Sequence, residues 1–300
     1  MMLMNQFDLS ASCSYCLCLE FIEHGALMRF IYLFLAVLTM SLPCVSFADN
    51  NHLSIPIILY HNLNPNVPGS MTVTPQKFEA NLKLLKDSGF TFIPLKQAVE
   101  YLQGKRATLP PKPVVVTADD GWESVYTYMY PIIKKFNIPV TLFIYPESIS
   151  SGKHFLSWDQ LKELKNTGLF DIQGHTYSHP NFKVAKKKLS PAAYEQFVQK
   201  ELFTSKKILE DKMGIKVTLL AWPFGIYNEY LEQQAEKAGY TMAFTIGYHT
   251  ANRSFKPMEQ PRFMIVDKLA KQTFDIILSS ATPKSNGNSK HQVAVRTSVT

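Results

Sequence analysis

Two short clusters of carboxylate and imidazole side chains suggest chemistry in this 300-residue chain. Asp119 and Asp120 are adjacent, and His175 and His179 are separated by three residues. Adjacent carboxylates repel each other unless a cation lies between them, and histidines at this spacing can bind one metal ion from a tight turn. One carboxylate and two imidazoles would provide three ligands and leave an open position, as in a catalytic zinc site. The spare carboxylate could then act as a base.

Each cluster also has a simpler interpretation. Asp-Asp-Gly is most often a turn, and histidines followed by Pro180 can be ordinary surface residues. Two further segments stand at the ends of strand-like sequences. His61 follows the sequence 54–60, and Trp222-Pro223-Phe224-Gly225 stands at the end of a strand that begins at 217. A lone histidine at a strand end is usually structural, but beside a metal site it would supply an acid. The combination indicates a metal site with its own acid and base.

Alternating strand and helix patterns surround these clusters. The sequence predicts strands at 54–60, 90–93, 113–117, 140–145, 169–173, 217–222, 242–245 and 263–266. It predicts helices at 96–102, 190–213, 228–238 and 268–278, with others beginning at Pro75, before Tyr126 and after the capping box that starts at Ser157. Repeated strand–helix units indicate a parallel sheet, and seven or eight of them predict a single distorted (β/α)7-8 barrel. Its active site is expected at the C-terminal ends of the strands.

The N-terminal 48 residues have the pattern of an export region. Arg29 precedes the apolar stretch 30–40, and Ser46-Phe47-Ala48 is a small-x-small cleavage site. We expect a signal peptide over 28–48, cleaved after Ala48, with 1–27 preceding an internal translation start. An uncleaved membrane anchor is the alternative. The product would be periplasmic, attached to the cell surface or extracellular, with a catalytic domain over 49–280 and a disordered tail over 281–300.

Cysteine and charge usage narrow the chemistry further. All four cysteines precede residue 49, which excludes a thiol nucleophile or a cysteine–zinc site from the exported part. The net charge is +7, and residues 1–48 contribute more acidic than basic groups. A basic exported protein favours anionic cell surfaces or polymers, so association with the cell envelope is expected. The lysines are scattered except for Lys186-Lys187-Lys188, which we expect on a solvated loop, and nucleic-acid binding is not expected.

The acidic and histidine motifs, and their order along the chain, resemble those of the polysaccharide deacetylases of carbohydrate esterase family four. The T-x-D-D-G segment at 117–121 and the H-[ST]-x-x-H segment at 175–179 carry the resemblance, which spans about 55–266. Leu59-Tyr60-His61-Asn62-Leu63 and Trp222-Pro223-Phe224-Gly225 resemble the branch that N-deacetylates poly-β-1,6-N-acetylglucosamine in biofilm matrix. The resemblance therefore implies a hydrolase that releases acetate from a polysaccharide.

The resemblance also implies a role for individual residues. The metal, expected to be Zn²⁺, would be bound by three side chains: Asp120, His175 and His179. Asp119 would be the general base and His61 the general acid. Arg262 could orient Asp119. The backbone N–H near Phe224 would help to hold the oxyanion. Trp222 and Tyr177 could stack on sugar rings, although core packing is the commoner role of any one such aromatic.

Several alternatives stay open at this point. His249 is a rival general acid, because other branches of the family draw this residue from a late strand. The acyl group could belong to peptidoglycan, acetylated xylan or a small cyclic amide rather than to the biofilm polymer. A barrel that binds glycan without catalysis is a further alternative, although an intact ligand set and base argue against it. The sequence leaves the metal in vivo and the oligomeric state open.

Overall fold

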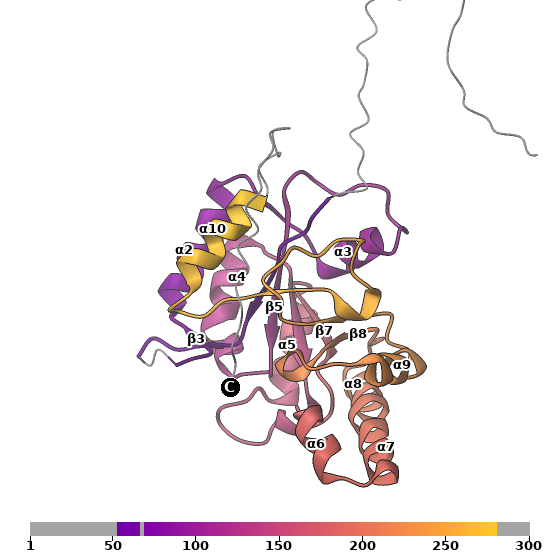
Figure 1. The fold of residues 1–300 in the computed structure, drawn as a ribbon. Coiled ribbons are helices and arrows are strands. Elements are labelled where there is room, and N and C mark those ends of the chain that lie inside the picture. Colours follow the sequence, from indigo (N-terminus) through magenta and orange to yellow (C-terminus); the bar gives the residue numbers. More distant parts are fainter. Residues whose placement is uncertain (1–52, 67–68, 281–300) are drawn as a thin grey trace, which may run out of the picture. The chain divides into compact units, whose positions relative to one another are not determined.

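Residues 53–66 and 69–280, which the computed structural model describes, contain a parallel sheet with helices packed around it (Figure 1). The strands are β1 (Ile57–Tyr60), β2 (Asn62–Leu63), β3 (Thr72–Val73), β4 (Thr91–Phe92), β5 (Pro113–Asp119), β6 (Val140–Ile144), β7 (Phe170–Gly174), β8 (Leu219–Ala221), β9 (Met242–Phe244) and β10 (Phe263–Met264). The main sheet has the order β10-β1-β5-β6-β7-β8-β9, with β4 beside β5. The predicted signal region and tail lie outside the described residues.

The two ends of this sheet approach each other just before β10. The N–H of Thr245 donates to the carbonyl of Gln260 (2.9 Å), and the N–H of Gln260 donates to the carbonyl of Ala243 (3.1 Å). These bonds connect the segment that leads into β10 with the end of β9. The sheet is therefore curled into a distorted barrel, and the predicted fold class is confirmed.

The helices alternate with the strands along the chain. They are α2 (Pro75–Asp87), α3 (Leu95–Leu102), α4 (Tyr130–Phe136), α5 (Trp158–Asn166), α6 (Phe182–Lys188), α7 (Pro191–Gln199), α8 (Ser205–Met213), α9 (Glu229–Lys237) and α10 (Ala270–Ser280). Of these, α2, α5 and α8 pack on one face of the sheet, and α3 packs on the other. Short 3₁₀ turns are η3 (Pro146–Ser148), η5 (Pro223–Gly225) and η6 (Pro257–Glu259). Two helix starts that the sequence predicts are confirmed: Thr74 caps α2, and Ser157 forms a capping box with Gln160 at α5.

Two predicted helices contain a π-helical turn. The helix expected over 190–213 runs through α7, the π-helical η4 (Lys200–Thr204) and α8, and the helix through Tyr126 begins with the π-helical η2 (Val125–Met129). A π turn keeps the apolar side of the helix facing the core, so the spacing of apolar residues does not reveal it.

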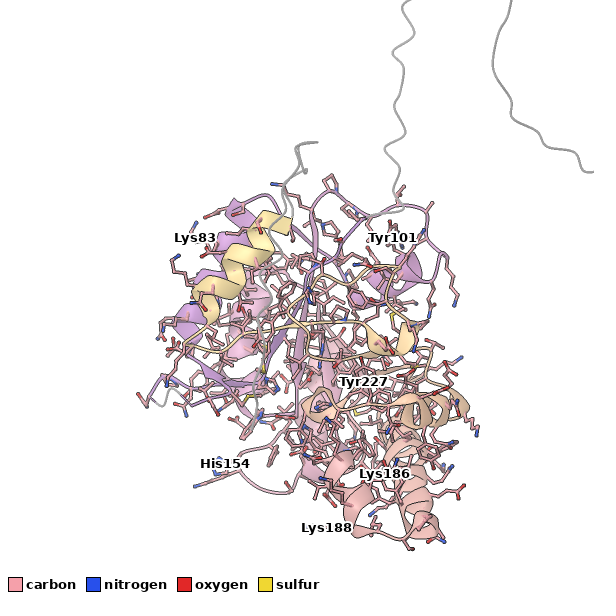
Figure 2. All side chains as sticks on the ribbon, viewed as in Figure 1. Lys83, Tyr101, His154, Lys186, Lys188 and Tyr227 are labelled. Carbon is pink, nitrogen blue, oxygen red and sulfur yellow. The ribbon has the colours of Figure 1, made fainter. Side chains whose placement is uncertain are left out.

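The lysine triplet at 186–188 corrects one expectation. It forms the last turn of α6 rather than a loop, because Asn181 caps this short helix and buried Phe182 fixes it to the core. The lysines are exposed, and Figure 2 shows Lys186 and Lys188 on the outside of the ribbon. Cations at a helix C-terminus interact favourably with the helix dipole.

Alternate residues of the strands divide the core into two clusters. Val116 of β5 belongs to a large cluster that includes the apolar residues of α2, α5 and α8. Val115 belongs to a second cluster with Ile57, Phe143 and the apolar side of α3, on the other face of the sheet. Strand alternation places Thr117 and Asp119 on the same face as Val115. In the residues that the structure describes, no helix is both long enough and apolar enough to cross a bilayer.

Candidate metal and catalytic site

The carboxylates of Asp119 and Asp120 lie at the C-terminal end of β5. Asp119 is the last residue of this fully buried strand and is only 2% exposed. Asp120 follows it with a φ of 76°, and Gly121 has a φ of 79°. Left-handed backbone is unfavourable for a residue other than glycine, so this turn is held by its surroundings. The change of direction after the strand separates the two carboxylates, which therefore have different neighbours.

Three side chains meet at one point of this end of the barrel. Oδ1 of Asp120 lies 3.5 Å from Nε2 of His175 and 3.5 Å from Nε2 of His179. One ligand atom from each residue lies within 4.8 Å of the other two. Oδ1 of Asp120 is buried and has no hydrogen-bond partner, whereas Oδ2 accepts a hydrogen bond from Nε1 of Trp122 (3.0 Å). A buried carboxylate oxygen without a partner is costly, and a cation between these three groups would remove that cost.

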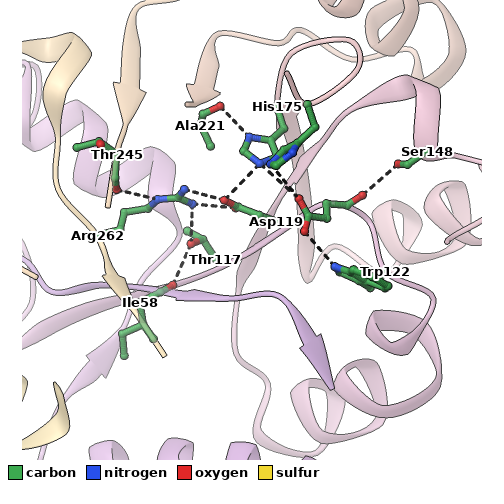
Figure 3. A network of polar contacts seen from close by, with 11 residues as sticks. Ile58, Thr117, Asp119, Trp122, Ser148, His175, Ala221, Thr245 and Arg262 are labelled. Atoms are coloured by element: carbon green, nitrogen blue, oxygen red, sulfur yellow. Dashed lines mark hydrogen bonds and ion pairs between the residues drawn. The ribbon is translucent and has the colours of Figure 1, made fainter. Parts of the chain in front are cut away.

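Hydrogen bonding and charge suit a metal at this point. Nδ1 of His175 donates to the carbonyl of Ala221 (2.8 Å), which leaves Nε2 facing Asp120 (Figure 3). Burial raises the pKa of Asp120, but its interactions with His175 and His61 outweigh burial, and the net pKa lies well below the usual range. Burial and the neighbouring His175 lower the pKa of His179 to about 4. Metal ligands must be unprotonated, so an anionic Asp120 and a neutral His179 fit a divalent cation.

The two histidines occupy a turn that follows β7, as the position of Pro180 predicts. Thr176 (φ 66°) and His179 (φ 54°) both have left-handed backbone. The imidazole rings of His175 and His179 contact each other. Their ring centroids are 4.7 Å apart.

Asp119 forms a buried ion pair with Arg262. Nη1 and Nη2 of Arg262 donate to Oδ1 (2.8 Å) and Oδ2 (2.7 Å) of Asp119, and Nη1 also lies 3.3 Å from Oγ1 of Thr117 (Figure 3). Arg262 is completely buried, and its guanidinium lies 5.1 Å from the ring centre of Phe143. Burial raises the pKa of Asp119, but the attraction of Arg262 and then of His175 outweighs burial, so the net pKa is lowered. Asp119 is therefore ionised at neutral pH.

His61 lies at the C-terminal end of β1, beside both carboxylates. Its side chain is buried, and among the described residues its Nδ1 has no hydrogen-bond partner. Neighbouring carboxylates favour the charged form of a histidine. Asp120 and Asp119 do raise its pKa, but burial lowers it by more, so the net pKa of His61 falls below 6.5. His249, the rival acid, is exposed and contacts the ring of Phe255.

The prediction that Trp222 stacks on a sugar is wrong. Its side chain is 1% exposed and packs edge-on against Phe182. Its Nε1 donates to the carbonyl of Met258 (2.9 Å), which satisfies the indole inside the core. Trp222 therefore supports the loop after β8 and offers no surface to a ligand.

Phe224 and Tyr177 lie closer to the solvent. Phe224 is 57% exposed with a φ of 57°, and its ring centroid is 4.6 Å from that of His179. This contact places the 223–225 turn next to the three clustered ligands. Tyr177 is half-buried, and Nζ of Lys200 lies 4.2 Å above its ring, so one face of this ring is covered.

Three further contacts of the site were not predicted from the sequence, which offered Trp122 only as an aromatic that could stack on a sugar ring. Trp122 donates to Asp120, Tyr145 places its ring 5.4 Å from that of His179, and buried Glu201 accepts hydrogen bonds from the histidine turn. Trp122 follows the predicted strand 113–117 and Tyr145 ends the predicted strand 140–145, and these positions are the signal that could have indicated their contacts. Glu201 lies in the middle of a helix, and no local pattern indicates its role.

Comparisons with known proteins show which family this chain resembles. A family model described as polysaccharide deacetylase matches residues 106–243. YxkH of Bacillus subtilis (strain 168), named after the same family, is 33% identical over 200 residues, or 66% of this chain and 67% of that protein. The poly-beta-1,6-N-acetyl-D-glucosamine N-deacetylase of Staphylococcus aureus (strain MRSA252) is 28% identical over 200 residues, or 65% of this chain and 68% of that protein.

Two solved structures have the same fold over most of their length. IcaB from Ammonifex degensii has a TM-score of 0.66 and 25% identity, and the match covers 76% of this chain and 97% of that one. The Streptococcus pyogenes deacetylase PplD, solved in complex with acetate, has a TM-score of 0.66 and 26% identity, covering 77% and 99%. Both share the fold of the present chain, which belongs to the polysaccharide deacetylase family by its similarity to YxkH and its match to the family model.

Proposed function

We propose that this protein is a metal-dependent hydrolase that removes N-acetyl groups from an exported polysaccharide, with poly-β-1,6-N-acetylglucosamine as the substrate. The observation that carries the proposal is the adjacency of a ligand cluster and a separate, ionised carboxylate. Nε2 of His175 lies 3.5 Å from Oδ1 of Asp120 and 3.7 Å from Oδ2 of Asp119. The similarity to a named deacetylase of this polymer supports the choice of substrate.

Asp120, His175 and His179 would hold a divalent cation, for which zinc is the expected identity. When bound, such a cation polarises the acetamide carbonyl and lowers the pKa of a coordinated water to about 7. Asp119 then acts as the general base that accepts the proton of the attacking water. Arg262 holds Asp119 by two hydrogen bonds, which keeps the carboxylate ionised and fixes its orientation.

His61 is the proposed general acid. An amine leaves poorly unless it is protonated, and His61 is buried beside both carboxylates, where a proton can be delivered to the scissile bond. The exposure of His249 argues against it as the acid.

The turn after β8 would assist at the carbonyl oxygen. The ring of Phe224 contacts that of His179, which places the backbone of this turn beside the proposed ligands. A backbone N–H there could stabilise the oxyanion of the tetrahedral intermediate, and that role is indifferent to the identity of the side chain. The uncovered face of half-buried Tyr177 could pack against a neighbouring sugar unit.

Acetate release tests the chemistry and the substrate together. Purified protein is incubated with poly-β-1,6-N-acetylglucosamine, with added zinc or with chelator, beside the variants Asp119→Asn and Asp159→Asn. Asp159 is an exposed carboxylate on α5, so its variant controls for loss of a charge elsewhere. We expect zinc-dependent release that falls by about 10²–10⁴-fold in Asp119→Asn only. Zinc binding without release would reject this substrate, and peptidoglycan and acetylated xylan would then be compared.

A comparison of amide and ester substrates tests the general acid. An ester has a better leaving group than an amide, so it depends less on protonation. We expect His61→Asn to lose more activity on the acetamide than on an acetyl ester, whereas His249→Asn changes neither. The opposite pattern would assign the acid role to His249.

Export is part of the proposal, with 28–48 as the signal and a mature chain that begins at Asp49. N-terminal sequencing of the protein recovered outside the cytoplasm tests this directly. Recovery of an uncleaved chain in the membrane fraction would instead support the anchor and an attachment to the cell envelope.

A further inference from the structure

The turn that carries His175 and His179 depends on contacts with a neighbouring helix. Two of its five residues, Thr176 and His179, have left-handed backbone, which is unfavourable for side chains other than glycine. Such a conformation persists only where the surroundings hold it. The N–H of Glu147 in η3 donates to the carbonyl of Tyr177 (3.1 Å), and the other hydrogen bonds to the residues between the two histidines come from η4 and α8.

Glu201 provides most of these contacts. Its Oε2 accepts the N–H groups of Tyr177 (2.9 Å) and Ser178 (2.8 Å), and its Oε1 accepts the hydroxyl of Ser178 (2.6 Å). The side chain is 1% exposed. In the described part of the chain no cation forms an ion pair with it, so its charge is stabilised by the donors of the turn. A buried carboxylate requires such donors, and hydrogen bonds to a charged acceptor are the strong kind.

Ser205 holds the preceding residue of the same turn. It lies four residues after Glu201, is fully buried, and donates its hydroxyl to the carbonyl of Thr176 (2.6 Å). Glu201 and Ser205 therefore bind three consecutive residues of the turn, those between the two histidines. One side chain accepts from the turn and the other donates to it, so the contacts specify its backbone conformation.

The π-helical turn η4 contains Glu201 and ends immediately before Ser205. A π turn disturbs the regular hydrogen bonds of a helix, and such turns are frequent at functional sites. Here the carbonyl of Leu202 accepts a hydrogen bond from the hydroxyl of Tyr240 (3.2 Å). The hydroxyl of Tyr240 also lies close to Gly174, the residue before His175. A Cβ atom on Gly174 would lie only 2.9 Å from this hydroxyl. The helix distortion, the end of β7 and the histidine turn are thus packed against one another.

We propose that Glu201 is a positioning residue, assisted by Ser205, which holds the 175–179 turn in the conformation that binds the metal. This inference rests on the proposed metal site, and it concerns affinity for the metal rather than the chemical step. Residues that hydrogen-bond to metal ligands and so orient them typically contribute about 10–100-fold to metal affinity. Glu201 differs from them in bonding the backbone between the ligands instead of the imidazole rings.

Zinc affinity of the full-length protein tests the proposal without any activity measurement. Metal-free protein is titrated with zinc in competition with a chromogenic chelator. We expect the Kd to rise about 10–100-fold in Glu201→Ala and several-fold in Ser205→Ala. Glu201→Gln should lie close to the wild type, because its amide oxygen can still accept both N–H groups and its NH₂ group can donate to the Ser178 hydroxyl.

Two control variants separate positioning from a general loss of stability. Glu195→Gln makes the same change at an exposed position of α7, and Val198→Ala removes buried core from the same helix without touching the turn. Urea unfolding of each metal-free protein measures its stability. We expect Val198→Ala to lose stability with an unchanged Kd, and Glu195→Gln to change neither.

The outcomes distinguish this inference from the proposed function. If the wild type binds zinc and folded Glu201→Ala binds it equally well, Glu201 does not position the turn. If Glu201→Ala does not fold, the zinc Kd of Ser205→Ala tests the proposal instead. A zinc Kd of Ser205→Ala equal to that of the wild type would overturn the proposal. If the wild type itself binds no zinc, the metal site fails, and this inference fails with it.

Discussion

At the scale of single residues, the site separates two carboxylates that are adjacent in the sequence. Asp119 faces the interior of the barrel and meets Arg262, whereas Asp120 turns away through its left-handed backbone and meets two imidazoles. The first therefore has a fixed cation of the protein beside it, and the second has an oxygen with no hydrogen-bond partner among the described residues. This difference in surroundings suits the two groups to the different roles proposed for them, base and metal ligand.

The buried pair of Asp119 and Arg262 can be tested by removing the cation. Arg262→Met leaves an uncompensated carboxylate in the core, which should lower the free energy of unfolding by about 3–5 kcal/mol. The pKa of Asp119 should rise because its main source of stabilisation is lost, so the acid limb of the activity profile should move to higher pH. Urea unfolding and a pH–rate profile measure the two effects. In Asp119→Asn/Arg262→Met, which removes both charges of this pair, part of the stability should return; failure to recover would contradict the pairing argument.

His61 predicts a pH dependence of stability in the metal-free protein. Its folded pKa lies below its unfolded value of about 6.5, so the unfolded state binds more protons as the pH falls. The corresponding stability is present above pH 6.5 and is lost as the pH falls toward the folded pKa. Urea unfolding between pH 7.5 and 5 in chelator should therefore show a shallower decline in His61→Asn. The difference can reach about 1.4 kcal/mol per pH unit. Identical slopes in both proteins would show that His61 is not perturbed.

At the scale of elements, local signals in the sequence were reliable where the physics is local. The capping box at Ser157 and the proline after Thr74 mark the starts of α5 and α2, because the bonds that cap a helix join residues three positions apart. Strand alternation likewise accounts for the inward direction of Asp119. Features that depend on distant partners were not predictable. The π turn in η4 is matched by contacts with Tyr240 and the histidine turn, and Trp222 is buried because Met258 accepts its hydrogen bond.

The capping box predicts a loss of stability confined to α5. Ser157→Ala removes the acceptor for the N–H of Gln160 (3.1 Å), which should lower the free energy of unfolding by about 1 kcal/mol. Ser157→Thr keeps an acceptor and should stay close to the wild type. Urea midpoints of the two variants measure the difference. Zinc affinity should be unchanged in both, since α5 supplies no ligand, and a weaker zinc affinity in Ser157→Ala would show that α5 is coupled to the site.

At the scale of the whole molecule, the barrel brings together residues that are far apart in the chain. Asp119 ends β5 and His175 follows β7, and they meet because these parallel strands end at the same edge. Arg262 instead precedes β10, and its long buried side chain reaches Asp119 through the interior. Sequence order alone does not give the distances between them. The resemblance to a family supplied the expected partners, and the curled sheet explains why such partners meet.

A site assembled from distant strands predicts that metal binding stabilises the entire fold. Its ligands have this arrangement only in the folded state, so zinc at 100 times its Kd should add about 2.7 kcal/mol to the free energy of unfolding. Urea unfolding with zinc or with chelator measures this difference. Asp120→Asn removes the one anionic ligand and should abolish most of it, whereas Asp159→Asn, which alters an exposed carboxylate, should keep it. Because the ligands come from two different strand ends, the stabilisation should appear as a shift of one cooperative transition. A separate early transition that zinc alone removes would show instead that the histidine turn unfolds independently of the barrel.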